Sequence, residues 1–576
     1  MLSMLFAFGA AANAVPAKKL QKVITLTNGT QVSVELRGDE YLSWWEGTDG
    51  TAYRATADDA VFEAFDLEAQ KPAAAARRAR AEQGRVARLA RVKNSLKGAD
   101  DKMRGLGGDH ITYKGVKKGL VVLVDFKNKK FADGHDLEYY KNVINGKDFS
   151  DEEEGYVGSV RDYFLAQSNG QFELDFDVVG PVTMSKNSGY YGNDGAYQKD
   201  EKVYEMIKEA CDGIQDKVNL KDYDWDGDGE ADQVFFLYAG LGQASGGSPG
   251  TIWPHESELR YWPCGVLSYS TGKINTYACA NELQPETQGS SRYISAGIGT
   301  ICHEFSHCLG FADMYDTTGG GGYGMSVFDV MDQGSYNGNG FVPCNYTAFE
   351  RIYAGWVEAI ELESPATVKD MKSVSDYGRP FIMYNYKNTN EYFLMENRQN
   401  TGWDEGLYGS NGLLIVHVNY VPSRWANNSV NSSAEKIQCC TVVNADGSRE
   451  NTQYSLQGDL YPYEVKGVTM NDEFTDESEP AAKLYTKNSD NSYALGIPIT
   501  QIKRSKGSVS FLVCGGDDNN VIDNTFNGVV DGINGVTVAD KTRDNRIYSI
   551  DGRYLGTDAS ALGKGIYVVG GKKIVK

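Results

Sequence analysis

The sequence has little proline, histidine and cysteine, and it has no apolar run long enough to cross a membrane. Its 576 residues include 14 prolines, 9 cysteines and 6 histidines. The longest strongly apolar run, residues 2–12, is shorter than the roughly 20 residues that a transmembrane helix requires. An odd number of cysteines, none in a CxxC pair, excludes a small disulfide scaffold and a cysteine-based zinc knuckle. Chemistry that depends on histidine is therefore confined to very few positions.

The apolar run near the N-terminus resembles an export signal. It ends in Ala12-Asn13-Ala14, a small-x-small pattern that is typical of a signal-peptidase site. We therefore expect residues 1–14 to be a signal peptide cleaved after Ala14, and the protein to be secreted or held on the outer cell surface. A buried N-terminal helix is the alternative interpretation.

The charge is strongly acidic, because 78 Asp and Glu residues outnumber 57 Lys and Arg residues and give a net charge of −21. A chain this acidic repels phosphate backbones and anionic lipids, so we expect neither nucleic acid nor a membrane surface as a partner. Hydrophobic residues make up 41% of the chain, which excludes wholesale disorder. The sequence also lacks a P-loop, a dinucleotide fingerprint and a GxSxG elbow.

The first hundred residues divide into two parts. Residues 18–67 alternate in polarity and predict two β-hairpins, with turns at Asn28-Gly29 and Asp49-Gly50. Residues 71–97 contain nine basic residues and one acidic residue, which predicts an exposed linker that trypsin-like proteases cut. A nucleic-acid patch is the alternative, but no aromatic residues are interleaved with the basic ones.

Further along, the composition predicts an α+β protein. Strand-like runs (GLVVLVDF from Gly119, FELDFDVVGPV, QVFFLYAG from Gln233) alternate with helical ones, such as 160–167, as far as residue 360. From residue 361 to 514 only strand-like runs remain, and they predict a β-sandwich-like domain. Residues 515–576 begin with GGDDNN and end in two hairpin-like pieces, so we expect a linker and a small C-terminal segment.

The segment TICHEFSHCLGFADMYD, residues 300–316, contains the pattern His303-Glu304-x-x-His307. Positions i and i+4 share one face of a helix, so both imidazoles can bind one zinc ion. Glu304 can then act on the zinc-bound water as a general base. Catalytic zinc requires a third protein ligand, and Asp313 stands at the spacing of the last histidine in the metzincin pattern HExxHxxGxxH. Asp316 and Glu350 remain alternatives for this third ligand.

Two further residues follow in the segment VFDVMDQGSYN. Met331 lies in a glycine-containing stretch, where metzincins have a Met-turn beneath the metal. Tyr336 could donate a hydrogen bond to the zinc-bound water or to the oxyanion, and we treat it as a candidate catalytic residue. For both, an ordinary core position is the alternative.

A second metal motif precedes the strand-like run QVFFLYAG. It contains alternating carboxylates with glycine at the sixth position, as in the first nine positions of an EF-hand calcium loop: Asp224, Asp226, Asp228, Glu230 and Asp232. Phe235 occupies the twelfth position, where an EF-hand has glutamate. We therefore expect a structural calcium site without flanking EF-hand helices, with a solvated acidic turn as the alternative.

Taken together, these motifs resemble the immune inhibitor A family of secreted bacterial metalloproteases. The resemblance covers about residues 119–514 and rests on HEFSHCLGFADMYD, VFDVMDQGSYN, SVRDYFLAQSNGQFELDFDVVGPV, DWDGDGEADQVFFLYAG, IWPH, EYFLMENRQNTGWD and GLLIVHV. It implies a zincin-type catalytic domain over residues 115–360, zinc, calcium and extracellular proteolysis. Its residues carry over onto His303, Glu304, His307 and Asp313.

The same resemblance implies that residues 15–98 form a propeptide. The first cysteine is Cys211, which excludes a cysteine switch, so we expect a carboxylate or backbone contact from the hairpin region to block the zinc until residues 77–97 are cut. The C-terminal pieces RIYSIDGRYLG and KGIYVVGGKKIVK resemble sorting domains of exported Bacteroidetes proteins, which implies a type IX secretion machinery as a partner.

These expectations combine into a secreted zinc endopeptidase that is made as a latent precursor and hydrolyses proteins or peptides. We expect an extended substrate to pair with an edge strand near residues 274–283 (INTYACANEL). The alternative is a catalytically silent surface adhesin on the same fold. An exopeptidase would need an anchor for a peptide terminus, and no motif for one is present.

Overall fold

The structure is a computed structural model. It describes residues 12–13, 15–56, 60–79, 113–194, 199–287, 290–318, 322–407, 411–432, 437–449, 455–526, 528, 547–549, 554–556, 566–569 and 572–575. The chain divides into a large unit, residues 1–531, and a small one, residues 532–576. In the small unit, four strands form a sheet in the order β28 (Tyr554–Gly556), β27 (Ile547–Ser549), β29 (Ile566–Val569) and β30 (Lys572–Val575). Within the described residues, no helix combines the length and apolarity needed to span a bilayer.

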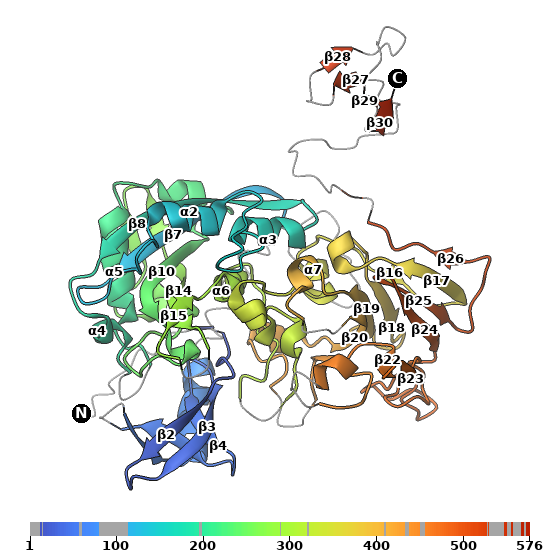
Figure 1. Cartoon of the computed structure of the whole chain (residues 1–576), viewed down its shortest axis with the longest axis horizontal. Coiled ribbons are helices and arrows are strands. Elements are labelled where there is room, and N and C mark those ends of the chain that lie inside the picture. The colour runs from blue at the N-terminus through green and yellow to red at the C-terminus, as the bar shows by residue number, and fades with distance from the viewer. Residues whose placement is uncertain are drawn as a thin grey trace. The chain divides into compact units, whose positions relative to one another are not determined.

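The N-terminal barrel, residues 21–64, is a closed five-stranded barrel (Figure 1). Its strands are β2 (Gln21–Leu26), β3 (Gln31–Gly38), β4 (Ser43–Gly47), β5 (Ala52–Ala55) and β6 (Val61–Ala64). The two predicted hairpins are confirmed as β2–β3 and β4–β5. Gly29 and Gly50 have φ values of 82° and 80°, a conformation that glycine adopts without strain. Closure of the barrel was not predicted, because it depends on the parallel pairing of β2 with β6.

A helix follows the barrel where the sequence predicted the start of a linker. Residues 67–79 are helical, and the rest of the predicted linker lies outside the described residues. Arg78 is buried and forms an ion pair with Asp39, while the Arg77 guanidinium donates to the carbonyl oxygen of Tyr41 at 2.5 Å. For residues 71–79 the linker prediction is therefore wrong. Two arginines that were expected in an exposed linker instead bind the helix to the turn that follows β3.

The α/β region, residues 113–357, is built on a mixed sheet. Its order is β1 (Ala12–Asn13), β11 (His255–Glu258), β14 (Thr276–Pro285), β10 (Val234–Leu241), β7 (Gly115–Asp125) and β8 (Phe172–Thr183), and β15 (Tyr293–Ser295) pairs with β14. The three strand predictions are confirmed as β7, β8 and β10, which are parallel to one another. A smaller sheet contains β12 (Leu267–Tyr269), β13 (Gly272–Ile274) and β9 (Glu230–Ala231).

The edge strand differs from the predicted one. Residues 274–283 lie mostly in β14, which is a central strand paired with both β10 and β11. Without the short N-terminal strand β1, the outermost strands of the sheet are β8 on one side and β11 on the other, and β11 is antiparallel to both β14 and β1. The prediction of residues 274–283 as an edge strand is therefore wrong, because an apolar run alone does not distinguish central strands from edge strands.

Helices cover both faces of the mixed sheet. They are α2 (Leu137–Asn145), α3 (Val160–Gln167), α4 (Ser188–Gly192), α5 (Val203–Ile214), α6 (Gly299–Cys308) and α7 (Ala348–Tyr353). The helix predicted at 160–167 is confirmed as α3, which Ser159 and Asp162 start with a reciprocal capping box. The buried residues of α3 and α6 belong to one apolar core, and the buried residues of α5 belong to a second one. The two cores contain alternate residues of the same sheet strands.

The C-terminal β region, residues 360–526, contains two main sheets that share an apolar core. One has the order β16 (Ile360–Glu361), β18 (Phe381–Tyr384), β19 (Glu391–Arg398), β20 (Gly412–Asn419) and β21 (Cys440–Val442). The other has the order β24 (Ile499–Ser505), β25 (Ser508–Val513), β17 (Ala366–Met371) and β26 (Val521–Ile522). A short hairpin, β22 (Tyr463–Val465) with β23 (Val468–Asn471), and helix α8 (Pro422–Ala426) complete the region. Strand β26 lies beyond residue 514, the predicted end of this region.

Arg398, at the end of β19, is a fully buried charge that joins the two regions. Its guanidinium donates two hydrogen bonds to Asp404, at 2.7 and 2.6 Å, and one to Glu396 at 3.0 Å. It also donates to the carbonyl oxygens of Phe328 and Asn345 in the α/β region, at 3.0 and 3.3 Å. One side chain thus neutralises carboxylates of the C-terminal β region and binds backbone carbonyl oxygens of the α/β region.

Replacing this arginine should destabilise the protein strongly. Arg398→Ala leaves buried carboxylates without a counter-charge, which costs about 3–5 kcal/mol in comparable cases. The measurement is the free energy of unfolding from denaturant titration. The matched control is Arg292→Ala, because the Arg292 side chain is 76% exposed and its ion pair with Glu286 should contribute at most about 1 kcal/mol. Equal effects of the two substitutions would contradict a structural role for the buried charge.

Candidate functional site

Helix α6 carries the HExxH motif, and all of its residues except Cys308 are buried. It begins at Gly299, where an added methyl group would lie 1.8 Å from the carbonyl oxygen of Ser335. Only glycine therefore allows the helix to start against the backbone of η5 (Gln333–Gly340). The helix gives way to a turn at Gly310, whose φ of 93° fits the predicted stop. This turn brings the chain back so that Asp313 faces the helix it has just left.

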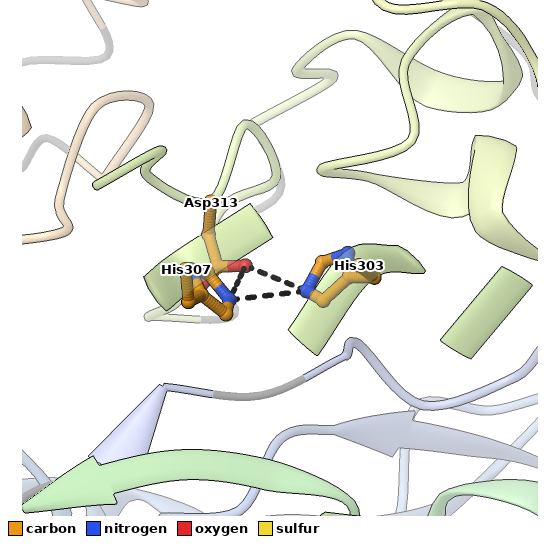
Figure 2. Close-up of side chains that lie close together, drawn as sticks. All are labelled: His303, His307 and Asp313. Carbon is orange, nitrogen blue, oxygen red and sulfur yellow. Dashed lines mark hydrogen bonds and ion pairs between the residues drawn. The ribbon is translucent and has the colours of Figure 1, made fainter. Parts of the chain in front are cut away.

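His303, His307 and Asp313 meet at one point (Figure 2). The two Nε2 atoms lie 3.2 Å apart, and they lie 3.2 and 3.3 Å from Oδ1 of Asp313. Tetrahedral ligands at the usual zinc distances are separated by about 3.3 Å. The donor set of two imidazole nitrogens and one carboxylate oxygen also suits zinc. These residues therefore fit a zinc ion with three protein ligands.

The orientation of each imidazole is fixed by its second ring nitrogen. Nδ1 of His303 lies 2.7 Å from the carbonyl oxygen of Val330, and Nδ1 of His307 lies 2.9 Å from that of Phe311. A carbonyl can only accept, so both Nδ1 atoms carry the proton and both Nε2 lone pairs are directed at the shared point. Val330 directly precedes Met331, which is fully buried. The Met-containing turn therefore lies against the first histidine.

Asp313 is held by a residue that the sequence did not single out. The Asn428 side chain accepts from the backbone N–H of Asp313 at 2.7 Å and donates to its Oδ2 at 2.5 Å. Burial opposes ionisation of Asp313, but the adjacent His307 and His303 lower its pKa below the usual range. Of the alternative ligands, Asp316 accepts from Thr318 and Gly322, and Glu350 accepts from Thr347, so both are engaged elsewhere.

Glu304 is fully buried beside the histidines, and burial raises its pKa well above the usual value. Its Oε1 accepts a hydrogen bond of 2.7 Å from the backbone N–H of Val15. Tyr336 also reaches this area, and its hydroxyl donates to the carbonyl oxygen of Pro16 at 2.8 Å. Both candidate catalytic residues therefore contact the same stretch of N-terminal backbone.

This stretch, the N-terminal segment (residues 12–13 and 15–18), crosses the site. Ala12 and Asn13 pair as β1 with Ser257 and Glu256 of β11. Beyond Val15, the carbonyl oxygens accept hydrogen bonds from side chains of the α/β region, as described below. The contact expected from the hairpin region thus comes, at Glu304, from residues before the hairpins. No local pattern marks these residues, because their partners lie hundreds of positions away.

Only three of the five predicted carboxylates in the acidic loop before β10 lie close together. Carboxylate oxygens of Asp224, Asp226 and Asp232 lie within 4.8 Å of one another. Burial, followed by the neighbouring aspartates, raises the pKa of Asp232 to about 7. Asp228 lies outside this group and accepts from the N–H of Glu230, whose own side chain pairs with Arg260 at 3.0 Å. In an EF-hand loop the seventh residue binds through its carbonyl, so that ion pair is compatible with a calcium site.

Comparison with known proteins agrees with this geometry. Residues 114–357 match the family model of the immune inhibitor A peptidase M6 catalytic domain. The chain is 27% identical over 324 residues to the pre-pro-metalloprotease PrtV of Vibrio cholerae serotype O1, covering 46% of this chain and 34% of that protein. It is 26% identical over 294 residues to immune inhibitor A of Bacillus thuringiensis subsp. alesti, covering 43% of this chain and 41% of that protein.

The family match covers the α/β region and its metal-type cluster. The aligned part spans only about a third to two fifths of the length of these curated relatives. The matched region is therefore similar to metallopeptidase catalytic domains, and the mixed helix-and-sheet fold expected for it is confirmed.

The role of Asn428 can be tested by metal affinity. Asn428 has a φ of 48°, so Asn428→Gly keeps the backbone unstrained while removing both hydrogen bonds to Asp313. Loss of such a supporting partner lowers metal affinity by about 10–100-fold. Zinc binding is measured by competition with a chelator. Asn427→Gly is the control, since it makes the same change at the neighbouring asparagine, whose backbone N–H donates to the carbonyl oxygen of Ser423. Unchanged affinity in Asn428→Gly would refute the assignment.

Proposed function

We propose that this chain is a secreted zinc-dependent endopeptidase that hydrolyses extracellular proteins and is made as a latent precursor. The observation that carries the proposal is the buried meeting point of His303, His307 and Asp313, next to Glu304 and beside the edge strand β11. The similarity of residues 114–357 to a peptidase catalytic domain supports it.

His303, His307 and Asp313 would hold the zinc ion, which supplies a Lewis acid that polarises a peptide carbonyl and activates water. Glu304 accepts a proton from the attacking water and returns it to the departing amide nitrogen. Returning the proton requires Glu304 to contact the nitrogen of a peptide bond. The hydrogen bond that Glu304 accepts from the backbone N–H of Val15 is a contact of this kind. Tyr336 steadies the oxygen on which negative charge develops.

Latency is proposed to come from the N-terminal residues. Besides the contact of Val15 with Glu304, Glu40 in the turn after β3 is buried near the cluster. Burial and the charges of Asp39 and Asp313 raise the pKa of Glu40 well above its usual value. A backbone contact and a hairpin carboxylate thus both support a block by residues 15–98, as the sequence suggested.

Three further features of the proposal rest mainly on the sequence. Residues 1–14 act as an export signal, and the strands β27–β30 belong to a sorting segment recognised by a secretion machinery. The loop of Asp224, Asp226 and Asp232, together with Asp228 and Glu230, binds a structural calcium ion, supported by the proximity of the first three carboxylates. The alternative to the peptidase is a surface adhesin that binds proteins without cutting them.

The role of Glu304 separates these alternatives. Glu304→Gln removes the base but keeps the volume of a fully buried side chain. Casein cleavage by the trypsin-activated chain should fall by about 10²–10⁴-fold, while one zinc per chain is retained. Glu358→Gln, on an exposed side chain, is the control and should keep full activity. If the wild-type chain binds zinc but neither form cleaves casein after activation, the adhesin alternative gains support.

Cutting the basic segment should relieve the block. Trypsin is expected to cut within residues 77–97, after which it is inhibited and casein cleavage is measured. Activity should rise by about tenfold or more, because the N-terminal residues lose the high effective concentration that the tether provides. A variant with Arg85, Arg88 and Arg91 changed to glutamine should be activated more slowly. A chain cut at this place that is no more active than the uncut chain would contradict the latency mechanism.

A further inference from the structure

We propose that the N-terminal segment lies across the candidate site as a bound peptide substrate does, and that its side chains identify two specificity pockets. The site selects a small aliphatic residue directly after the cleaved bond, and a lysine three residues further on that Gln284 and Asn339 bind. This inference deepens the proposed peptidase function and rests on it.

The register follows from the contact between Val15 and Glu304. In a zinc peptidase the general base hands its proton to the nitrogen of the bond that breaks. The nitrogen of Val15, 2.7 Å from Oε1 of Glu304, therefore takes the position of this leaving nitrogen. Before the export signal is removed, residues 12–13, which precede Val15, pair with the edge strand β11 in antiparallel orientation, which is how a sheet edge binds an extended peptide. Val15 then corresponds to the first residue after the cleaved bond.

The first pocket surrounds Val15, which is completely buried. Its side chain belongs to a small apolar cluster that contains Ala244 and Trp253 of the α/β region and Ala17 and Leu36 of the N-terminal part, and Tyr336 packs against this cluster. The indole Nε1 of Trp253 donates to the carbonyl oxygen of Val15 at 3.1 Å. The Trp253 backbone N–H is in turn fixed by Asp200 at 2.9 Å. The apolar side chains of Ala244 and Trp253, with one backbone anchor, suit a small aliphatic side chain and offer no partner to a charged one.

The residues after Val15 are held by hydrogen bonds to their backbone atoms. The carbonyl oxygen of Pro16 accepts from Tyr336, and that of Ala17 from the Gln333 side chain at 3.4 Å. The backbone N–H of Lys18 donates to the carbonyl oxygen of Ala244 at 3.0 Å. Most of these partners belong to the α/β region and bind backbone atoms, so they would serve any extended peptide.

The second pocket holds the ammonium group of Lys18. Its Nζ lies 2.5 Å from Oε1 of Gln284 and 2.6 Å from Oδ1 of Asn339. The Gln284 amide is itself oriented, because its Nε2 donates to the carbonyl oxygens of Ser295 and Asn339, at 3.0 and 2.5 Å. Both amide oxygens are therefore positioned as acceptors for a cation. Burial lowers the pKa of Lys18 to about 8, so the ammonium form predominates at neutral pH.

Two substitutions at Asn339 isolate this pocket. Its φ of 60° suits glycine and aspartate as well as asparagine, so Asn339→Gly and Asn339→Asp should both fold. Glycine removes one acceptor from the ammonium group, and aspartate replaces a neutral acceptor with a charged one. The probes are the synthetic peptide AAANAVPAKKL, which reproduces residues 10–20, and two versions with methionine in place of Lys18 or aspartate in place of Val15.

The measurement uses the full chain cut by trypsin, with trypsin then inhibited. Peptide binding is followed by fluorescence anisotropy, and the cut position and rate by mass spectrometry. The wild-type chain should cut before valine and prefer the lysine peptide over the methionine peptide by about tenfold, the contribution of a hydrogen bond to a charged group. Asn339→Gly should reduce this preference, because only Gln284 still accepts from the ammonium group, whereas Asn339→Asp should increase it. The version with aspartate in place of Val15 should be cut at least tenfold more slowly.

The outcomes distinguish the inference from the function it rests on. Peptides that bind with these preferences but are not cut would uphold the two pockets and refute the peptidase. Casein cleavage without preference for valine or lysine, or a preference that Asn339→Gly leaves unchanged, would overturn the pockets and keep the peptidase. Failure of the peptide to bind a chain that cleaves casein would also overturn the inference.

Discussion

Two imidazoles and a carboxylate share one buried point, and much of the surrounding structure serves to hold them there. Each of these groups would be costly to bury without partners. The partners come from separate segments: Val330 holds His303, Phe311 holds His307, and Asn428 holds Asp313. The cluster therefore depends on the packing of those segments against α6, and a shift in any of them would misdirect a ligand atom.

The C-terminal β region is part of this support. Asn428 follows α8, and residues of β18 to β21 share an apolar core with α3 and α6. Arg398 reaches from β19 to the carbonyl oxygens of Phe328 and Asn345, on either side of the Met-containing turn. The predicted domain boundary at residue 360 thus marks a change in sequence pattern, but the apolar core continues across it. The α/β region has the ligands, but it does not orient all of them by itself.

The sequence predicted what short-range patterns control. The HExxH spacing, the turn at Gly310 and the offset of Asp313 lie within eleven residues, so one helix and one turn suffice to join them. The strands β7, β8 and β10 were recognisable as apolar runs. The edge position of β11, the pairing of β1 and the role of Asn428 depend on partners 115 or more residues away. The linker prediction for residues 71–79 was wrong for a similar reason. A run of basic residues predicts exposure to solvent, and the sequence did not show that Asp39 pairs with Arg78.

The N-terminal segment also has a consequence for the order in which the protein assembles. Val15 precedes Glu304 by 289 positions, and Asn428 follows Asp313 by 115. During synthesis the covering strand and the barrel emerge first, the ligand helix later, and the residue that completes the cluster later still. The N-terminal segment is therefore already made when Asn428, the last partner of the cluster, emerges. A growing chain passes through no stage in which the cluster is complete and this segment is still missing.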